Sequence, residues 1–259
     1  MTAHVAQAAD ERDLRPGSGD VPADGICRRP LRARLAQAVY RRTSLPFRLV
    51  FGIAAWLRSR RRTSVLDHEG TSDDYLTAHT REFFRERWLF GYHRVFDLLY
   101  QFRPPADMAS LRVLSLGPRT EIELYYLWLL FGFRWGHISG ADLVSTSPRI
   151  QVADMSVSLP FPDDTFDVLV ASHSLEKSGH PERTRDEIRR VVRPNGWVLV
   201  GGDTMPAGAP ATETWPIPVR YFRDGAQGLI ELYDVHLEEI DYLQAHSPHG
   251  FEIIFRVRK

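Results

Sequence analysis

The sequence contains little cysteine and little lysine. Among its 259 residues there are one cysteine, Cys27, and two lysines, Lys177 and Lys259. A single cysteine excludes a disulfide within the chain and a four-cysteine zinc site. The basic side chains are therefore almost all arginines, a bias that a genome of high GC content also produces, so we give the preference itself no functional meaning.

Long hydrophobic runs are also missing. The apolar stretch at residues 45–57 covers 13 residues and includes Arg48. A helix that spans a bilayer needs about 20 apolar residues, so this stretch is too short to cross one. Residues 1–26 lack the positive start and apolar core of a secretory signal. We therefore expect a cytoplasmic protein, and we keep a membrane-peripheral one open.

One long segment has no acidic residue. Between residues 28 and 62 there are 11 arginines and neither Asp nor Glu. The formal net charge of +0 is a cancellation: residues 1–62 carry +8 (13 Arg against 5 Asp/Glu) and residues 63–259 carry −8 (20 Lys+Arg against 28 Asp/Glu). This asymmetry predicts a basic arm attached to an acidic globule. Because the negative globule repels phosphates, we expect no nucleic-acid partner.

The first hundred residues are predicted to lie outside the main domain. Residues 1–26 are rich in Ala, Asp, Gly and Pro and bury too little apolar surface to fold, which predicts a flexible tail. Residues 27–105 are predicted to form an Arg-rich helical extension or cap, with helical patterns over 31–62, broken near 44–46, and over 71–102. Two interpretations of Arg28–Arg62 stay open. The helix packs on its own domain, or it contacts an anionic membrane surface.

From residue 106 on, short apolar runs alternate with helical patterns. Strands are predicted at 111–116, 137–141, 150–153, 166–171 and 196–201, and helices at 121–133 and 181–192. Apolar strands between helices are typical of a parallel sheet covered on both faces. Two later runs, 236–244 and 251–257, predict an antiparallel hairpin. Residues 106–259 are therefore predicted to form an α/β domain.

Polar residues follow the predicted strands at the edge where open parallel sheets bind ligands. Here the sequence resembles the class I (Rossmann-like) S-adenosylmethionine (SAM)-dependent methyltransferases over about residues 109–202. The segment 113–121 (VLSLGPRTE) stands where that family has its glycine-rich first motif, and 140–143 (GADL) resembles the second strand end. Residues 152–167 resemble the adenine-side segment, and 190–196 (RVVRPNG) the turn before the fifth strand. The resemblance implies a mainly parallel seven-stranded sheet and SAM as cofactor.

The first motif departs from the family pattern. The family loop usually begins with an acid and has two or three glycines, whereas here Ser115 takes the place of the acid and Gly117 is the only glycine. Thr120 and Glu123 fit a capping box at the next helix. Acids at a helix start disfavour a pyrophosphate and suit a cationic ligand. A dinucleotide oxidoreductase would need G-x-G-x-x-G here, which the loop lacks. The seven residues 143–149 leave no room for the usual helix before the third strand.

The resemblance implies specific cofactor contacts. Asp142 would hold the ribose hydroxyls, Asp154 the adenine amino group, and Met155 would pack on the ring. Each also has a structural alternative: Asp142 caps a turn, Glu121 and Glu123 cap their helix, and Met155 fills the core. The complete set of cofactor-binding candidates is Gly117, Pro118, Glu121, Asp142, Leu143, Asp154, Met155 and Ser172.

Two residues after the fourth strand are candidates for catalysis. Methyl transfer depends mainly on positioning, and a general base helps when the acceptor is a hydroxyl. His173 and Glu176 are the catalytic candidates, although a lone loop histidine is often structural. No metal site is predicted. The acceptor site is expected in residues 75–100 and 203–222.

These patterns predict a SAM-dependent methyltransferase acting by O- or N-methyl transfer on a small molecule, such as a glycan or natural-product precursor in a biosynthetic pathway. Two alternative functions stay open: a non-catalytic methyltransferase-like binding module, or a membrane-surface-associated methyltransferase for a lipid-linked substrate. For either, a homo-oligomer also stays open.

Overall fold

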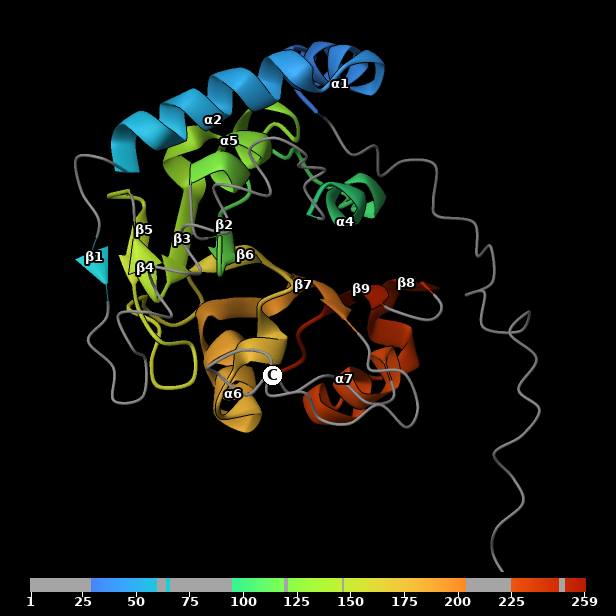
Figure 1. Cartoon of the computed structure of the whole chain (residues 1–259). Helices are drawn as coiled ribbons and strands as arrows, with labels where there is room; N and C mark the ends of the chain where they lie inside the picture. The colour runs from blue at the N-terminus through green and yellow to red at the C-terminus, as the bar shows by residue number, and fades with distance from the viewer. Residues whose placement is uncertain are drawn as a thin grey trace, which may run out of the picture.

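A seven-stranded sheet forms the centre of the computed structural model (Figure 1). The structure describes residues 29–59, 64–65, 95–118, 121–145, 147–203, 225–246 and 250–259. The predicted tail 1–26 lies outside these residues, as do most of the helical pattern over 71–102 and the segment 204–224.

The strand order is β5-β3-β2-β6-β7-β9-β8. The strands are β2 (Val113–Leu116), β3 (Ile138–Asp142), β5 (Ile150–Val152), β6 (Phe166–Ser172), β7 (Val192–Asp203), β8 (Ile240–His246) and β9 (Gly250–Arg256). The first five in spatial order pair in parallel, and β9 lies antiparallel between β7 and β8. This arrangement confirms the predicted fold class, including the C-terminal antiparallel hairpin.

Both faces of the sheet are covered, which explains why its strands read as continuous apolar runs. On one face lie α5 (Glu121–Leu129) and α4 (Val95–Gln101), and on the other α6 (Pro181–Val191) and α7 (Ala226–Tyr233) (Figure 1). Successive residues of β2 point to opposite sides. Val113 joins the core beneath α5, and Leu114 joins the core beneath α6 and α7.

Several predicted boundaries were wrong. The helix expected over 121–133 ends at Leu129, and the polypeptide then turns through Gly132, whose φ is +92°. The strand expected at 196–201 begins at Val192, so part of the predicted turn 190–196 pairs with β6, with an irregular register before Trp197. The hairpin's first strand starts at Ile240, after a short 3-10 helix, rather than at residue 236.

The connection between β3 and β5 contains no helix among its described residues, as predicted. It forms the two-residue strand β4 (Val144–Ser145), which pairs antiparallel with β1 (Ser64–Val65). This pairing joins the end of the N-terminal region to the sheet edge next to Asp142.

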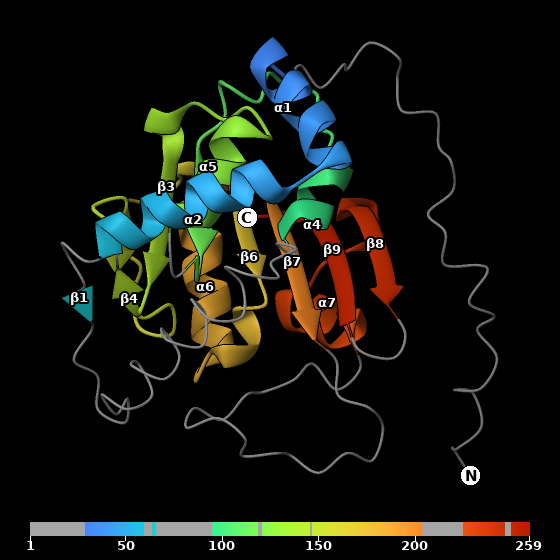
Figure 2. The ribbon, with the colours of Figure 1, turned by 45° about the horizontal axis from the view of Figure 1, so that its top comes forward.

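The N-terminal region forms two helices, α1 (Leu31–Arg42) and α2 (Leu45–Ser59), with the break close to where it was predicted. Both pack outside α5 (Figure 2). The Phe51 ring lies 5.2 Å from that of Tyr125, centroid to centroid. The guanidinium of Arg29 donates to the Leu99 carbonyl (3.1 Å), and that of Arg41 lies 4.9 Å from the Tyr100 ring centroid. Arginines of this segment therefore bind carbonyls and aromatic rings of the same molecule.

Candidate functional site

The carboxyl ends of the parallel strands meet at one edge of the sheet. The chain runs outward from β2 through β3 to β5 on one side, then crosses to β6 and β7 on the other, so the strand order reverses at β2. Ligands of open α/β sheets bind outside such a reversal. One residue stands at or just after the carboxyl end of each of five neighbouring strands: Gly117, Asp142, Asp154, His173 and Asp203.

Gly117 makes the closest contact between two of these loops. Its φ is +78°, and a Cβ atom at this position would lie 2.6 Å from the Ser174 Cβ. The Ser174 hydroxyl donates to the Leu116 carbonyl (2.8 Å), and the Gly117 N–H donates to the Ala141 carbonyl (2.8 Å). The loops after β2 and β6 are therefore pressed together, and only glycine fits between them. Pro118, next in the chain, is buried.

Glu121 and Glu123 are both buried at the start of α5, with 1% and 4% of their surface exposed. The Glu121 carboxylate accepts hydrogen bonds from the Tyr125 hydroxyl (2.5 Å) and from the Ser147 hydroxyl. Ser147 belongs to the connection between β3 and β5, so Glu121 ties that connection to the helix. Its contact with a cofactor stays a prediction. The capping box predicted between Thr120 and Glu123 lies partly outside the described residues.

Glu123 of α5 is hydrogen-bonded to Ser115 of β2, the residue that the sequence resemblance places at the family's acid. Its carboxylate accepts a hydrogen bond from the Ser115 hydroxyl. Ser115 stands where the resembled family begins its loop with an acid. The fold therefore brings a carboxylate to this position from the helix.

Asp142 is the last residue of β3 and Leu143 follows it, both in half-buried positions. The Asp142 side chain accepts a long hydrogen bond from the Val144 N–H (3.3 Å), and its carbonyl accepts one from the Ala153 N–H (2.9 Å). The turn cap that the sequence left open is therefore present. The half-buried position leaves the carboxylate accessible at the ligand edge, where binding of ribose hydroxyls stays a prediction.

Asp154 and Met155 follow β5 in half-buried positions. The Asp154 carboxylate accepts a hydrogen bond from the Ser156 N–H (2.7 Å). Met155 packs against the α6-side core, and its carbonyl accepts from the Thr184 hydroxyl (3.2 Å). Thr184 continues a buried chain of hydroxyls through Ser178 to Ser156, with oxygens 2.7 Å and 3.1 Å apart. This chain fixes the loop that carries Asp154 and Met155, and no sequence spacing indicated it.

A second network, centred on Arg190 and Glu187 of α6, binds the residues that follow this loop in the chain. Arg190 donates to the Glu187 carboxylate (2.7 Å), to Asp163 (2.9 Å) and to the carbonyl of Leu159 (2.9 Å). Glu187 also accepts from the Leu159 N–H (2.7 Å). The hydrogen bonds from Arg190 are the main cause that lowers the pKa of Glu187 below its ordinary value.

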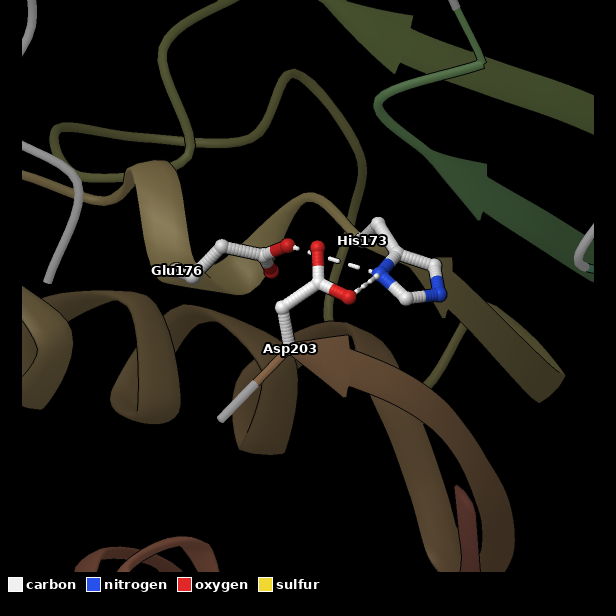
Figure 3. A group of neighbouring side chains, drawn as sticks. All are labelled: His173, Glu176 and Asp203. Carbon is white, nitrogen blue, oxygen red and sulfur yellow. Dashed lines mark ion pairs between the residues drawn. The ribbon is translucent and has the colours of Figure 1, made fainter. Parts of the chain in front are cut away.

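The Nδ1 atom of His173 faces two carboxylates, those of Glu176 and Asp203 (Figure 3). It follows Ser172 at the end of β6 with φ +55°, and its N–H donates to the Gly201 carbonyl (2.7 Å). The Nδ1 atom is 3.2 Å from Asp203 Oδ1 and 3.7 Å from Glu176 Oε1. A non-glycine residue in the left-handed region is uncommon, and such positions cluster at functional sites.

Asp203 was not among the predicted catalytic or cofactor-binding residues, although it begins the segment 203–222 where the acceptor site was expected. It is the last residue of β7 and the first polar residue after the apolar run 197–200 and Gly201-Gly202. The rule that singled out Asp142 and Asp154 would therefore have found it, had the predicted strand not ended at residue 201.

The cluster of His173, Glu176 and Asp203 could act in two ways, as a base or as a cation site. A carboxylate that accepts from the Nδ1–H of His173 leaves Nε2 as the basic atom. The three donor atoms also lie within 4.8 Å of one another, so His173, Glu176 and Asp203 could hold a cation. The sequence predicted no metal site, but that prediction was made without Asp203.

Parts of this chain are similar to known proteins. Residues 137–200 match the family described as methyltransferase domain. The glycine/sarcosine/dimethylglycine N-methyltransferase of Actinopolyspora halophila is 30% identical over 116 residues, which cover 40% of this chain and 20% of that enzyme. The chain thus spans about a fifth of that relative's length.

Solved structures share the fold. Phosphoethanolamine N-methyltransferase 2 of Haemonchus contortus, solved with SAM, has a TM-score of 0.56 at 14% identity, covering 71% of this chain and 58% of its own. A SAM-dependent methyltransferase of Aquifex aeolicus has a TM-score of 0.50 at 12% identity, and the match covers 70% of this chain and 97% of that one. These likenesses show that the chain has the fold of Rossmann-like SAM-dependent methyltransferases, and its residues 137–200 match a methyltransferase domain.

Proposed function

We propose that the chain binds SAM at the carboxyl edge of its sheet and transfers the methyl group to a small-molecule acceptor. The observation that carries this proposal is the convergence of the loops bearing Gly117, Asp142, Asp154 and His173 at the reversal of strand order. The acceptor atom is an oxygen or a nitrogen. A glycan or natural-product precursor is the acceptor class that we propose.

The residues at this edge fit the cofactor. Gly117 has no side chain, which lets the loops after β2 and β6 come together at this edge. Asp142 would hold the ribose hydroxyls, and Asp154 with Met155 would hold the adenine. The remaining predicted contacts come from Pro118, Glu121, Leu143 and Ser172. When bound, SAM supplies an activated methyl group.

His173 is the proposed general base. Its Nδ1–H donates to Asp203, which orients the ring, and its Nε2 accepts the proton that the acceptor loses. Glu176 is the second carboxylate at Nδ1 and favours the protonated imidazole once it forms. Proton acceptance at Nε2 suits a hydroxyl or a protonated amine as acceptor.

Calorimetry with SAM and with S-adenosylhomocysteine tests the cofactor site. We expect both to bind and Asp142→Ala to weaken the binding at least about tenfold, the value of one lost charge-assisted contact. Asp186→Ala, which removes an exposed acid on α6, is the matched control. If neither ligand binds at millimolar concentration, the proposal fails.

The single-glycine loop favours one alternative, a methyltransferase-like fold that binds without catalysing. Retained SAM binding without methyl transfer to any tested acceptor, in wild type and His173 variants alike, would support this alternative. Measurable methyl transfer to a pathway intermediate would reject it.

A further inference from the structure

We propose that the outward faces of α1 and α2 form a docking surface for an anionic lipid membrane. Ten large apolar residues are exposed in the part of the chain that the structure describes, and eight of them lie on these two helices. They are Leu31, Leu35, Val39, Leu45, Leu49, Val50, Ile53 and Leu57, with 46–68% of their surface exposed. Such a concentration of exposed apolar side chains marks an interaction site.

The exposed residues form one stripe on each helix. Leu31, Leu35 and Val39 are spaced by four along α1, and Leu45, Leu49, Ile53 and Leu57 are spaced by four along α2. Residues four apart share a face of an α-helix. The opposite faces are already used, since Ala33 and Tyr40 of α1 and Phe51 of α2 are buried in the core beneath them.

The two stripes belong to the outermost layer of the molecule. Figures 1 and 2 show α1 and α2 lying outside α5, on the side of the sheet away from α6 and α7. Packing against α5 therefore accounts for the inner faces of the two helices and leaves the outer faces to another partner.

The charge of this segment selects the partner. Residues 28–62 contain 11 arginines and no acid, and Arg34 and Arg42 are exposed on α1. In a symmetric dimer through these stripes, the same basic segment would face its own copy without one carboxylate to neutralise it. In an anionic membrane, the lipid headgroups neutralise arginines, and the acyl chains beneath them take up the apolar stripe.

The helices would lie in the plane of the membrane surface. Within the described residues, no helix has the length and apolar character that crossing a bilayer requires. A helix that carries an apolar face and flanking arginines binds the boundary between headgroups and acyl chains.

Flotation of the full chain with vesicles tests the proposal. We expect the protein to float with vesicles of phosphatidylcholine and phosphatidylglycerol and to stay behind with phosphatidylcholine alone. Leu49→Glu with Ile53→Glu should lower recovery about tenfold, because it places acids in the apolar stripe. Leu237→Glu, which changes an exposed leucine outside the two helices (82% exposed), is the matched control.

Three results would overturn the proposal. The first is equal recovery of the protein with and without phosphatidylglycerol. The second is a stripe variant that floats like wild type. The third is a stripe variant whose only effect is to break a dimer seen without vesicles, which would assign this face to a second copy of the chain. Circular dichroism and SAM calorimetry on every variant separate loss of docking from loss of folding or of the proposed cofactor site.

Discussion

The Nδ1 atom of His173 lies 3.2 Å from Oδ1 of Asp203, although His173 follows β6 and Asp203 ends β7. The parallel pairing of β6 with β7 brings them together, because Ser172 pairs with Gly201 just before both positions. The pairing of β6 with β7 thus sets the imidazole and the carboxylate close together at the carboxyl edge of the sheet.

Asp203→Asn should lower kcat about 10²-fold with little change in KM for SAM, because the amide no longer holds the tautomer with a basic Nε2. The measurements are initial rates and the pH dependence of kcat, which should change in this variant and not in Asp186→Asn. An unchanged pH profile with a normal kcat would remove Asp203 from the mechanism.

His173→Asn should abolish most of the methyl transfer while leaving SAM binding intact. Asparagine tolerates the left-handed backbone that this position requires (φ +55°), so the variant separates loss of the base from backbone strain. Turnover and calorimetry on the same preparation provide the check. Near-normal turnover would mean that the acceptor needs no base.

Gly117→Ala should weaken SAM binding and destabilise the fold by about 1–3 kcal/mol, since a Cβ atom would lie 2.6 Å from that of Ser174 at a φ of +78°. Thermal unfolding and calorimetry measure both effects. Gly179→Ala is the control, because nothing lies within 4 Å of the added carbon there. Equal effects of the two substitutions would contradict the close loop contact.

Sequence patterns predicted the sheet well and the contacts of the site poorly. Strands such as β2 and β6 are buried on both faces, so their apolar runs identify them without further information. The partners of Glu121 and Glu123 could not be predicted in this way. Ser147 and Ser115 reach them only through the tertiary fold, whereas local spacing suggested helix caps. The helix α7 was missed because its eight residues are too few to show a clear period.

Glu123→Ala should cost about 1–3 kcal/mol of unfolding free energy, because it leaves the buried Ser115 hydroxyl without this acceptor. Adding Ser115→Ala should restore part of that loss, with a coupling of about 1 kcal/mol in a double-mutant cycle. Urea unfolding of the four proteins gives the coupling. Strict additivity would show that the two side chains act independently.

Arg190→Met should destabilise the protein by about 1–3 kcal/mol at neutral pH and should reduce the pH dependence of stability. Arg190 lowers the pKa of Glu187. This pair therefore stabilises the fold above the ordinary glutamate pKa and loses its contribution as the pH falls through the lowered one. Wild type should accordingly lose more stability than the variant between pH 7 and the acidic range. Urea unfolding at several pH values measures the difference, and parallel pH curves for the two proteins would contradict it.

Because Arg190 also holds the Leu159 carbonyl, SAM binding should weaken in the variant at neutral pH. Such a loss would link this network to the loop of Asp154 and Met155.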